Sequence, residues 1–229
     1  MREAIILAGG FGTRLRELVP DLPKPMAPVA GQPFIEIVLR SLAAKGFSRV
    51  VLSLGYMAEK ISNYFGSNFE GMDIHYAVED QPLGTGGAVR LALTQCTREP
   101  IFILNGDTFL DFEVDCIERL WLEHRRPIIV AREVPDTGRY GRLLVQDGLV
   151  KGLTEKGAVG PGLINAGFYV FNRVQLDAFE LNQPFSIEVD FLAKAVGEMP
   201  VDVFVTQGQF IDIGVPEDFH RAQTELAGR

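Results

Sequence analysis

Three glycines and two arginines lie close together in one stretch near the N-terminus, from Gly9 to Arg16. Glycine lets a chain turn at positive φ and lets backbone N–H groups approach a ligand, because no Cβ stands in the way. Arg14 and Arg16 add fixed positive charge to the same loop. Backbone donors combined with guanidinium groups are suited to holding phosphate.

Two well-known phosphate loops do not fit this spacing. A dinucleotide fingerprint would need its third glycine at position 15, which is Leu15, and no Gly-x-x-x-x-Gly in the chain is followed by lysine. A glycine-rich turn after a strand can also be no more than a tight connection. The loop therefore needs support from a second segment.

That support comes from a lysine placed between prolines, in Pro23-Lys24-Pro25. Proline fixes φ and stiffens the chain, so the Lys24 ammonium is presented from a restricted backbone. A lysine in such a turn often simply faces solvent. Because Lys24 follows a basic glycine loop so closely, we interpret it as a second phosphate-binding cation.

Two aspartates stand at the ends of apolar runs. Asp107 follows the run 100–104, and Asp212 lies within the run 210–214. An aspartate after a strand is normally a turn or cap residue, whereas one inside an apolar strand costs free energy unless a cation satisfies it. Near phosphate loops, a hard divalent cation needs carboxylate oxygens of this kind.

A second glycine-rich turn, Gln81 to Ala88, opens a helical stretch. The free N–H groups at a helix start can bind an anion, but an ordinary capped turn explains the spacing equally well. From the residues alone both interpretations stay open.

The elements that must position these residues alternate along the chain. Apolar runs predict strands at 4–8, 50–54, 74–78, 100–104, 128–131 and 164–171, and periodic stripes predict helices at 33–45, 58–65, 89–93 and 114–124. Two short strands are expected around Gly148, a helix capped by Ser186, and a closing helix from Pro216. Glu188, in the first turn of the helix after Ser186, is predicted to be mostly structural. The fold class is α/β, with ligands at the carboxyl ends of parallel strands.

Composition narrows the function classes. The chain has 229 residues, 47% of them hydrophobic, which is enough for a full core, and we expect one domain. Its net charge of −8, with no basic run longer than Arg125-Arg126, argues against binding nucleic acid. The N-terminal apolar run is too short for a signal sequence and no run is long enough to span a membrane, so the expected location is the cytoplasm. The two cysteines have no metal-binding spacing and are expected to be reduced thiols.

The run Leu-Ala-Gly-Gly-x-Gly-Thr-Arg-Leu (7–15), followed by Pro-Lys-Pro-Met-x-Pro-Val (23–29), resembles the signature of sugar-1-phosphate nucleotidyltransferases. These enzymes join a nucleoside triphosphate to a sugar 1-phosphate and release pyrophosphate. Stretches 21–31 and 79–88 look most similar to the D-glycero-D-manno-heptose 1-phosphate guanylyltransferases. The segment 15–22 lacks the Pro-Leu-Thr of common relatives, which supports this subfamily.

The resemblance implies a three-layer α/β/α, Rossmann-like core with a mostly parallel mixed sheet. It also implies a single domain over 1–229, with a nucleotide-binding lobe (1–135) and a sugar-phosphate lobe with the closing helix (136–229). The helical-repeat or β-helix domain that many relatives carry after the core is not expected here.

The resemblance assigns roles residue by residue. Catalysis is assigned to Arg14, Lys24, Asp107 and Lys156, and Mg²⁺ binding to Asp107 and Asp212. Nucleotide binding is assigned to Leu7, Ala8, Gly9, Gly10, Gly12, Thr13, Arg14, Lys24, Glu79, Gln81, Pro82, Gly84, Thr85, Gly86 and Asp107. Sugar-phosphate binding is assigned to Asn105, Gly141, Glu155, Lys156, Asn165 and Asp212. Without the resemblance, the pair Glu155-Lys156 would be interpreted as a solvated hairpin tip.

The expected activity is Mg²⁺-dependent transfer of GMP from GTP to D-glycero-α-D-manno-heptose 1-phosphate, giving a GDP-sugar for a capsule, an S-layer or another surface glycan. The alternatives are a mannose 1-phosphate guanylyltransferase, a uridylyl- or thymidylyltransferase, and a non-catalytic nucleotide-sugar sensor. A nicotinamide oxidoreductase is disfavoured by Leu15. The partners are thus a nucleoside triphosphate and a sugar 1-phosphate, and a homodimer is one expectation for the assembly.

Overall fold

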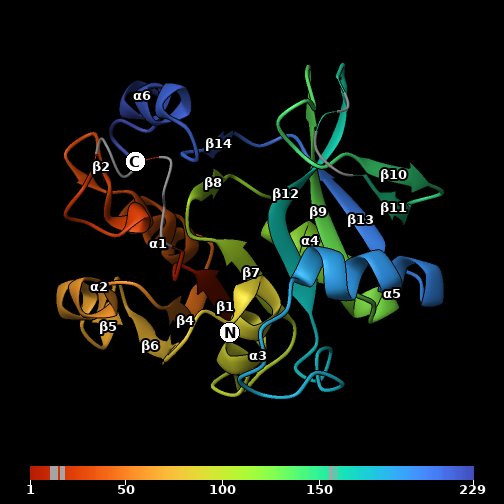
Figure 1. Ribbon diagram of the computed structural model, residues 1–229, viewed down its shortest axis with the longest axis horizontal. Coiled ribbons are helices and arrows are strands. Elements are labelled where there is room, and N and C mark those ends of the chain that lie inside the picture. Colours follow the sequence, from red (N-terminus) through yellow and green to blue (C-terminus); the bar gives the residue numbers. More distant parts are fainter. Residues whose placement is uncertain (11–14, 16–18, 155–156, 158) are drawn as a thin grey trace.

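The chain folds around one ten-stranded sheet, as the computed structural model shows (Figure 1). The structure describes residues 1–10, 15, 19–154, 157 and 159–229. In spatial order the strands are β10 (Leu143–Gln146), β11 (Leu149–Leu153), β13 (Asp202–Thr206), β9 (Ile128–Val134), β12 (Gly162–Phe171), β7 (Ile101–Asn105), β1 (Arg2–Leu7), β4 (Phe47–Leu54), β6 (Met72–Val78) and β5 (Asn68–Phe69).

Most of the sheet is parallel, as predicted. Strands β6, β4, β1 and β7 run in one direction, and β9 and β13 share it. Strand β12 runs in the opposite direction between β7 and β9, which makes the sheet mixed. The sheet is continuous from the N-terminal half of the chain into the C-terminal half.

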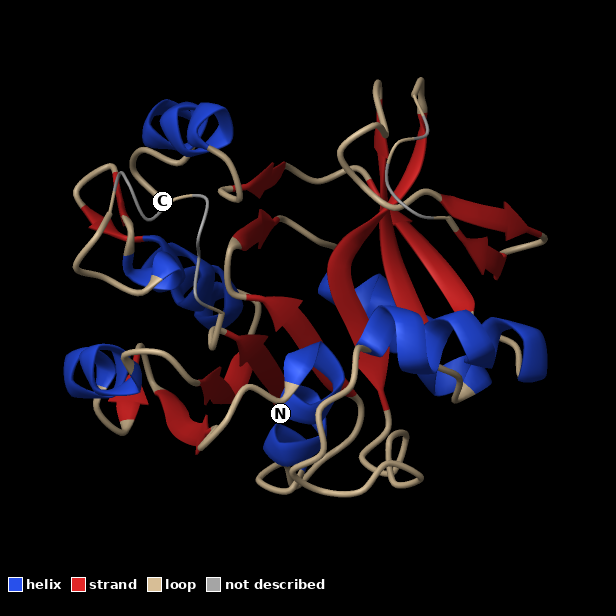
Figure 2. Ribbon diagram, viewed as in Figure 1, coloured by secondary structure: helices blue, strands red, loops and turns tan. Residues whose placement is uncertain are grey.

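Helices cover both faces of the sheet, which confirms the three-layer prediction (Figure 2). In β1 the side chains of Ala4 and Ile6 face one core cluster, and Ile5 between them faces the other. The first cluster includes residues of α1 (Phe34–Ala44), α2 (Ala58–Phe65), α4 (Val114–His124) and α6 (Pro216–Glu225). The second includes residues of α3 (Gly84–Leu93), the π-helix Ile187–Leu192 and α5 (Ala193–Glu198).

Two small antiparallel ribbons lie outside the main sheet. One pairs β2 (Pro28–Val29) with β3 (Gln32–Pro33), directly after a 3₁₀-helix, Lys24–Met26. The other pairs β8 (Thr108–Leu110) with β14 (Phe210–Asp212). The second ribbon joins the loop after β7 to the segment that precedes α6.

Strand β13 was not predicted from the sequence. Its signal is the placement of Val201, Val203 and Val205 at alternate positions, in a short run that contains Asp202. The helix expected after Ser186 also begins differently, with a π-helical turn in place of a regular first turn.

The carboxyl ends of the central strands meet at one edge of the sheet. The Ala8 N–H donates to the Ser53 carbonyl at the end of β4 (2.8 Å), and the Gly106 N–H donates to the Leu7 carbonyl (2.8 Å). The Glu79 N–H, after β6, donates to the Leu54 carbonyl (2.8 Å). The loops predicted to bind ligand therefore begin side by side.

Among the described residues, no helix is long and apolar enough to cross a membrane.

Candidate active site

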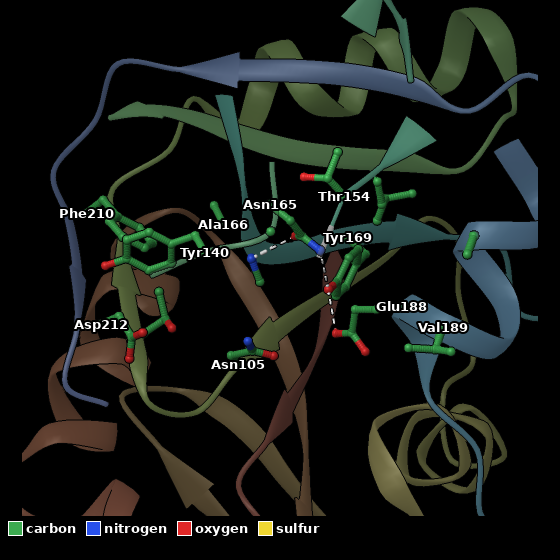
Figure 3. A pocket seen from close by; sticks show the side chains of 15 residues that line it. Asn105, Tyr140, Thr154, Asn165, Ala166, Tyr169, Glu188, Val189, Phe210 and Asp212 are labelled. Carbon is green, nitrogen blue, oxygen red and sulfur yellow. Dashed lines mark hydrogen bonds between the residues drawn. The ribbon is translucent and has the colours of Figure 1, made fainter. Parts of the chain in front are cut away.

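A cleft of about 790 Å³ opens between the end of β7, strand β12 and the β8–β14 ribbon. Four of the residues predicted to bind the sugar phosphate line it, namely Asn105, Gly141, Asn165 and Asp212. Figure 3 labels Asn105, Asn165 and Asp212. The other lining residues are Thr108, Tyr140, Leu153, Thr154, Ala166, Gly167, Tyr169, Glu188, Val189, Ala193 and Phe210.

Asp107 lies beside Asp212, which lines one end of the cleft. The β8–β14 pairing places Asp212 opposite Thr108, and the Ile213 N–H donates to the Asp107 carbonyl at 2.9 Å. Burial raises the pKa of the Asp212 carboxyl, and the negative charge of Asp107 raises it further, against the opposing effect of Lys24. The two acids therefore share one electrostatic environment although 104 residues separate them in sequence.

Lys24 completes this group. Its ammonium Nζ lies 2.5 Å from Asp107 Oδ2, and its side chain is only 13% exposed. The flanking Pro23 and Pro25 are buried, so the segment is anchored on both sides of the lysine. The structure thus brings together a cation and two carboxylates that the sequence places in three separate segments.

The two carboxylates fit a magnesium site that is completed by substrate. Among the described residues no group of three or more histidine, cysteine, aspartate or glutamate side chains is close enough to hold a metal ion. Mg²⁺ is usually held by one or two carboxylates together with substrate phosphates and water, so two aspartates are sufficient.

The glycine loop starts beside Glu79. A Cβ added to Gly9 would lie 3.1 Å from Glu79 Oε1 and 3.1 Å from the Gly55 amide nitrogen, so a side chain at position 9 would crowd both. Gly10 is exposed and has open space around it. The predicted nucleotide-binding residues Gly12, Thr13 and Arg14 lie outside the described residues.

Glu79 has a defined structural partner. Its Oε2 accepts a hydrogen bond from the Leu83 N–H (2.8 Å), which closes the turn over 79–83. Burial raises the pKa of the Glu79 carboxyl, and the hydrogen bond from Leu83 opposes the rise. The second oxygen faces Gly9, which leaves it available to an adjacent ligand.

The second glycine-rich turn divides into two parts. Gln81, Pro82 and Gly84 are exposed. Gly86 is buried, its N–H donates to the Phe185 carbonyl (2.9 Å), and a Cβ there would lie 2.2 Å from the Phe185 ring. Close packing therefore accounts for glycine at position 86, and its contact with nucleotide stays a prediction.

Thr85 also has partners within the protein. Its hydroxyl donates to Glu188 Oε2 (2.9 Å) and accepts from the Ile187 N–H (2.9 Å). These bonds tie the start of α3 to the π-helix, and a role for Thr85 in nucleotide binding likewise stays a prediction.

On the sugar-phosphate side, Asn165 is held by two bonds. Its Oδ1 accepts from the Gly167 N–H (3.0 Å), and its Nδ2 donates to the Tyr169 hydroxyl (2.9 Å). Gly141 lies beside it, because its carbonyl accepts from the Asn165 N–H (3.4 Å). The predicted residues Glu155 and Lys156 lie outside the described residues.

Several lining residues were not predicted as site residues from the sequence. Tyr140 and Phe210 pack edge to face, with ring centroids 5.8 Å apart, near Asp212. Tyr140 could have been found because it lies within 139–142, a segment already assigned to the sugar half. Glu188 was predicted to be mostly structural, and no local signal shows that its side chain reaches the cleft.

Replacing Asp212 with asparagine is expected to raise the melting temperature of the metal-free protein by a few degrees at about pH 7.5. The raised pKa means that ionised Asp212 is less favourable in the folded chain than in the unfolded chain. The stability associated with the protonated carboxyl is fully present below the unfolded pKa, about 4, and is lost as the pH rises through the raised value. Melting curves in EDTA across this range measure the effect. A lower melting temperature for the variant at about pH 7.5 would contradict the prediction.

A sequence profile described as "Nucleotidyl transferase" matches residues 3–229. A D-glycero-alpha-D-manno-heptose 1-phosphate guanylyltransferase from Aneurinibacillus thermoaerophilus is 39% identical over 225 residues, which cover 98% of each chain. An enzyme of the same name from Campylobacter jejuni is 37% identical, covering 95% of this chain and 97% of its own.

Solved structures show the same architecture. HddC from Yersinia pseudotuberculosis, crystallised in complex with GMP-PN, superposes with a TM-score of 0.86 at 34% identity, covering 97% of this chain and 98% of HddC. A putative glucose-1-phosphate thymidylyltransferase from Bacillus anthracis has a TM-score of 0.88 at 18% identity, covering 100% of this chain and 96% of its own, and shows the fold alone.

Proposed function

The chain belongs to the nucleotidyl transferase family, and on this basis we propose that it transfers GMP from GTP to D-glycero-α-D-manno-heptose 1-phosphate. The products are pyrophosphate and a GDP-sugar. The observation that carries the proposal is identity of 39% and 37% with two heptose 1-phosphate guanylyltransferases over nearly the full length of each chain. The GDP-heptose would serve the synthesis of a surface glycan such as a capsule or an S-layer.

A second candidate substrate is mannose 1-phosphate. A mannose-1-phosphate guanyltransferase from Gibberella zeae is 34% identical, but the match covers only 62% of that protein. Because this match has lower identity and covers less of the relative than the matches to the heptose enzymes, mannose 1-phosphate is the less favoured substrate.

In the proposed reaction, a phosphate oxygen of the sugar 1-phosphate attacks the α-phosphorus of GTP in line, and pyrophosphate leaves. The nucleophile is already an anion, so the protein need not supply a general base. The barrier comes largely from bringing two polyanions together and from charge on the α-phosphoryl group. Cations and backbone N–H groups that neutralise this negative charge are therefore the groups that lower the barrier.

The residues divide this task by position. Lys24 and Arg14 would hold the β- and γ-phosphates and the departing pyrophosphate, and Lys156 would bind the phosphate of the sugar. Asp107 and Asp212 would hold Mg²⁺, which supplies charge neutralisation at the phosphates when bound. The cluster of Lys24, Asp107 and Asp212 at one end of the cleft supports this assignment.

The cleft also supports the proposed division of the single domain at residue 135. Asn105 and Thr108 line it from the nucleotide-binding lobe, and the rest of its lining comes from residues 140–212. A reaction between two substrates requires contributions from both lobes. A homodimer remains part of the proposal for the assembly.

Base selection is assigned to Glu79, whose carboxylate can accept hydrogen bonds from the N1–H and N2–H₂ groups of guanine. Replacing Glu79 with glutamine is expected to reduce the preference for GTP over UTP by about tenfold or more, because uracil lacks that pair of donors. Steady-state kcat/KM for both triphosphates measures the ratio. Asp80→Asn, at the exposed neighbour, is the matched control. An unchanged ratio in Glu79→Gln would remove this role.

A substrate panel tests the function itself. Purified enzyme with Mg²⁺ is assayed for pyrophosphate release with GTP, UTP, dTTP and ATP, each paired with heptose, mannose and glucose 1-phosphates. We expect GTP with the heptose substrate to give the highest kcat/KM. Preference for UTP or dTTP would overturn the guanylyltransferase assignment, and tight binding without pyrophosphate release would indicate a sensor.

A further inference from the structure

Glu188 lies at the opposite end of the cleft from Asp212, with Asn105 between them (Figure 3). It is carried by the π-helix Ile187–Leu192, a type of turn that is rare and often marks a functional site. Its side chain lines the cleft and also accepts a hydrogen bond from Ser186, the residue that caps this turn.

The Glu188 carboxylate is held by three hydroxyl groups. Oε1 accepts from the Tyr169 hydroxyl (2.9 Å), and Oε2 accepts from the hydroxyls of Thr85 (2.9 Å) and Ser186 (2.9 Å). Tyr169 is fully buried and its pKa is raised well above the usual value, mainly by burial, so it remains a phenol donor. Its oxygen in turn accepts from Asn165, another cleft residue.

These contacts leave acceptor capacity on the cleft side. A carboxylate has about four acceptor positions, and the three hydroxyl donors use three. Among the described residues, no lysine, arginine or histidine forms an ion pair with Glu188. Its negative charge is thus stabilised by neutral donors only, which keeps it a strong acceptor for a further hydroxyl group.

Two backbone N–H groups at the start of the π-helical turn are satisfied by residues other than Glu188. The Ser186 hydroxyl accepts from the Val189 N–H (3.2 Å), and Asp190 Oδ2 accepts from the Ser186 N–H (2.8 Å). These two bonds satisfy the start of the turn. The Glu188 carboxylate joins this turn to Thr85 and Tyr169, and its remaining acceptor position is open to a ligand in the cleft.

Building on the proposed function, we infer that Glu188 determines sugar specificity by accepting a hydrogen bond from the terminal hydroxyl of the sugar's exocyclic chain. The phosphate of the sugar must reach the α-phosphate of GTP at the end of the cleft that holds Asp212, so the part of the sugar remote from the phosphate points toward Glu188 at the other end. The neighbouring Val189 and Ala193 also line this end and can pack against the carbon chain. A seven-carbon sugar carries a hydroxyl at C7, which mannose lacks.

The test compares two sugars in three proteins. Wild-type enzyme, Glu188→Gln and Asp190→Asn are assayed with GTP and either D-glycero-α-D-manno-heptose 1-phosphate or mannose 1-phosphate. Asp190→Asn is the matched control, because it is an isosteric change on the same turn at a residue that does not line the cleft.

We expect Glu188→Gln to lower kcat/KM for the heptose substrate by about 10- to 100-fold, mainly through KM, since a hydrogen bond to a charged group is lost. With mannose 1-phosphate the change should stay within about threefold, and the KM for GTP should not move, because neither involves the C7 hydroxyl. Asp190→Asn should leave the ratio between the sugars as in the wild type. If Glu188→Gln does not fold, Glu188→Asp is the second variant, because its side chain is one methylene shorter and its carboxylate lies further from the sugar. It should lower the ratio of kcat/KM for the heptose substrate to kcat/KM for mannose 1-phosphate.

An equal loss for both sugars, or the same ratio in the Glu188 and Asp190 variants, would overturn the inference and leave the proposed function standing. Failure of the wild-type enzyme to use the heptose substrate with GTP would instead refute the proposed function itself.

Discussion

Replacing Asp107 with asparagine is expected to lower kcat by about 100- to 10,000-fold while the protein remains folded. The Asp107 carboxylate pairs with Lys24 and lies beside Asp212, at the place where the triphosphate must meet a cation. An amide of the same size offers no negative charge to a divalent ion. The loss should therefore appear in turnover and in the Mg²⁺ concentration needed for half-maximal rate.

A matched control exists four residues further along. Asp111 forms an ion pair with Lys45 (2.7 Å) that resembles the pair of Asp107 with Lys24 (2.5 Å), but Asp107 and not Asp111 is among the charges that shift the pKa of Asp212. Asp111→Asn should keep kcat and the Mg²⁺ dependence of the wild type. Near-normal pyrophosphate release by Asp107→Asn, in a folded protein, would exclude Asp107 from the mechanism.

Replacing Lys24 with alanine is expected to lower kcat by about 100- to 1,000-fold, the size of effect seen when one donor to a developing charge is lost. Lys24 forms an ion pair with Asp107 and its charge also acts on Asp212. The lysine lies between two buried prolines, which anchor its segment. Its ammonium would stabilise charge that builds up on the departing pyrophosphate. Because this interaction strengthens during the reaction, kcat should fall more than the affinity for GTP.

Lys45→Ala is the corresponding control, since it removes the ion pair with Asp111 and leaves the cleft unchanged. Single-turnover measurement of pyrophosphate release separates the chemical step from binding. A rise in KM for GTP with kcat unchanged would show that Lys24 only binds the ground state. Full activity in Lys24→Ala would remove it from the catalytic group.

Much of the fold could be predicted because the signals are local. Alternating apolar side chains in β1 put Ala4 and Ile6 on one face of the sheet and Ile5 on the other. The helix predicted over 114–124 begins and ends where α4 does. Strand β13 was missed because its apolar run is short and contains Asp202, and pairing with β9 and β11 places it inside the sheet.

Some residues of the candidate site could likewise be predicted from the sequence, and others could not. The phosphate loop, Lys24 and the two aspartates could be proposed from the sequence because glycine, proline and a carboxylate after an apolar run are informative at their own positions. The turn after Ser186 was expected to be an ordinary helix start with Glu188 mostly structural. The structure begins this helix with a π-helical turn that packs against α3, and Glu188 on it reaches the cleft.

The sequence by itself determined which segments are buried, which are rigid and which carry charge, because these properties depend on side-chain type and near neighbours. Only the tertiary structure decided which distant segments meet. The pairing of β8 with β14 brings Asp107 to Asp212, and the packing of α3 against the π-helix brings Thr85 to Glu188. Such contacts depend on strand order and register, which are fixed by burial of the whole core and not by any one stretch of residues.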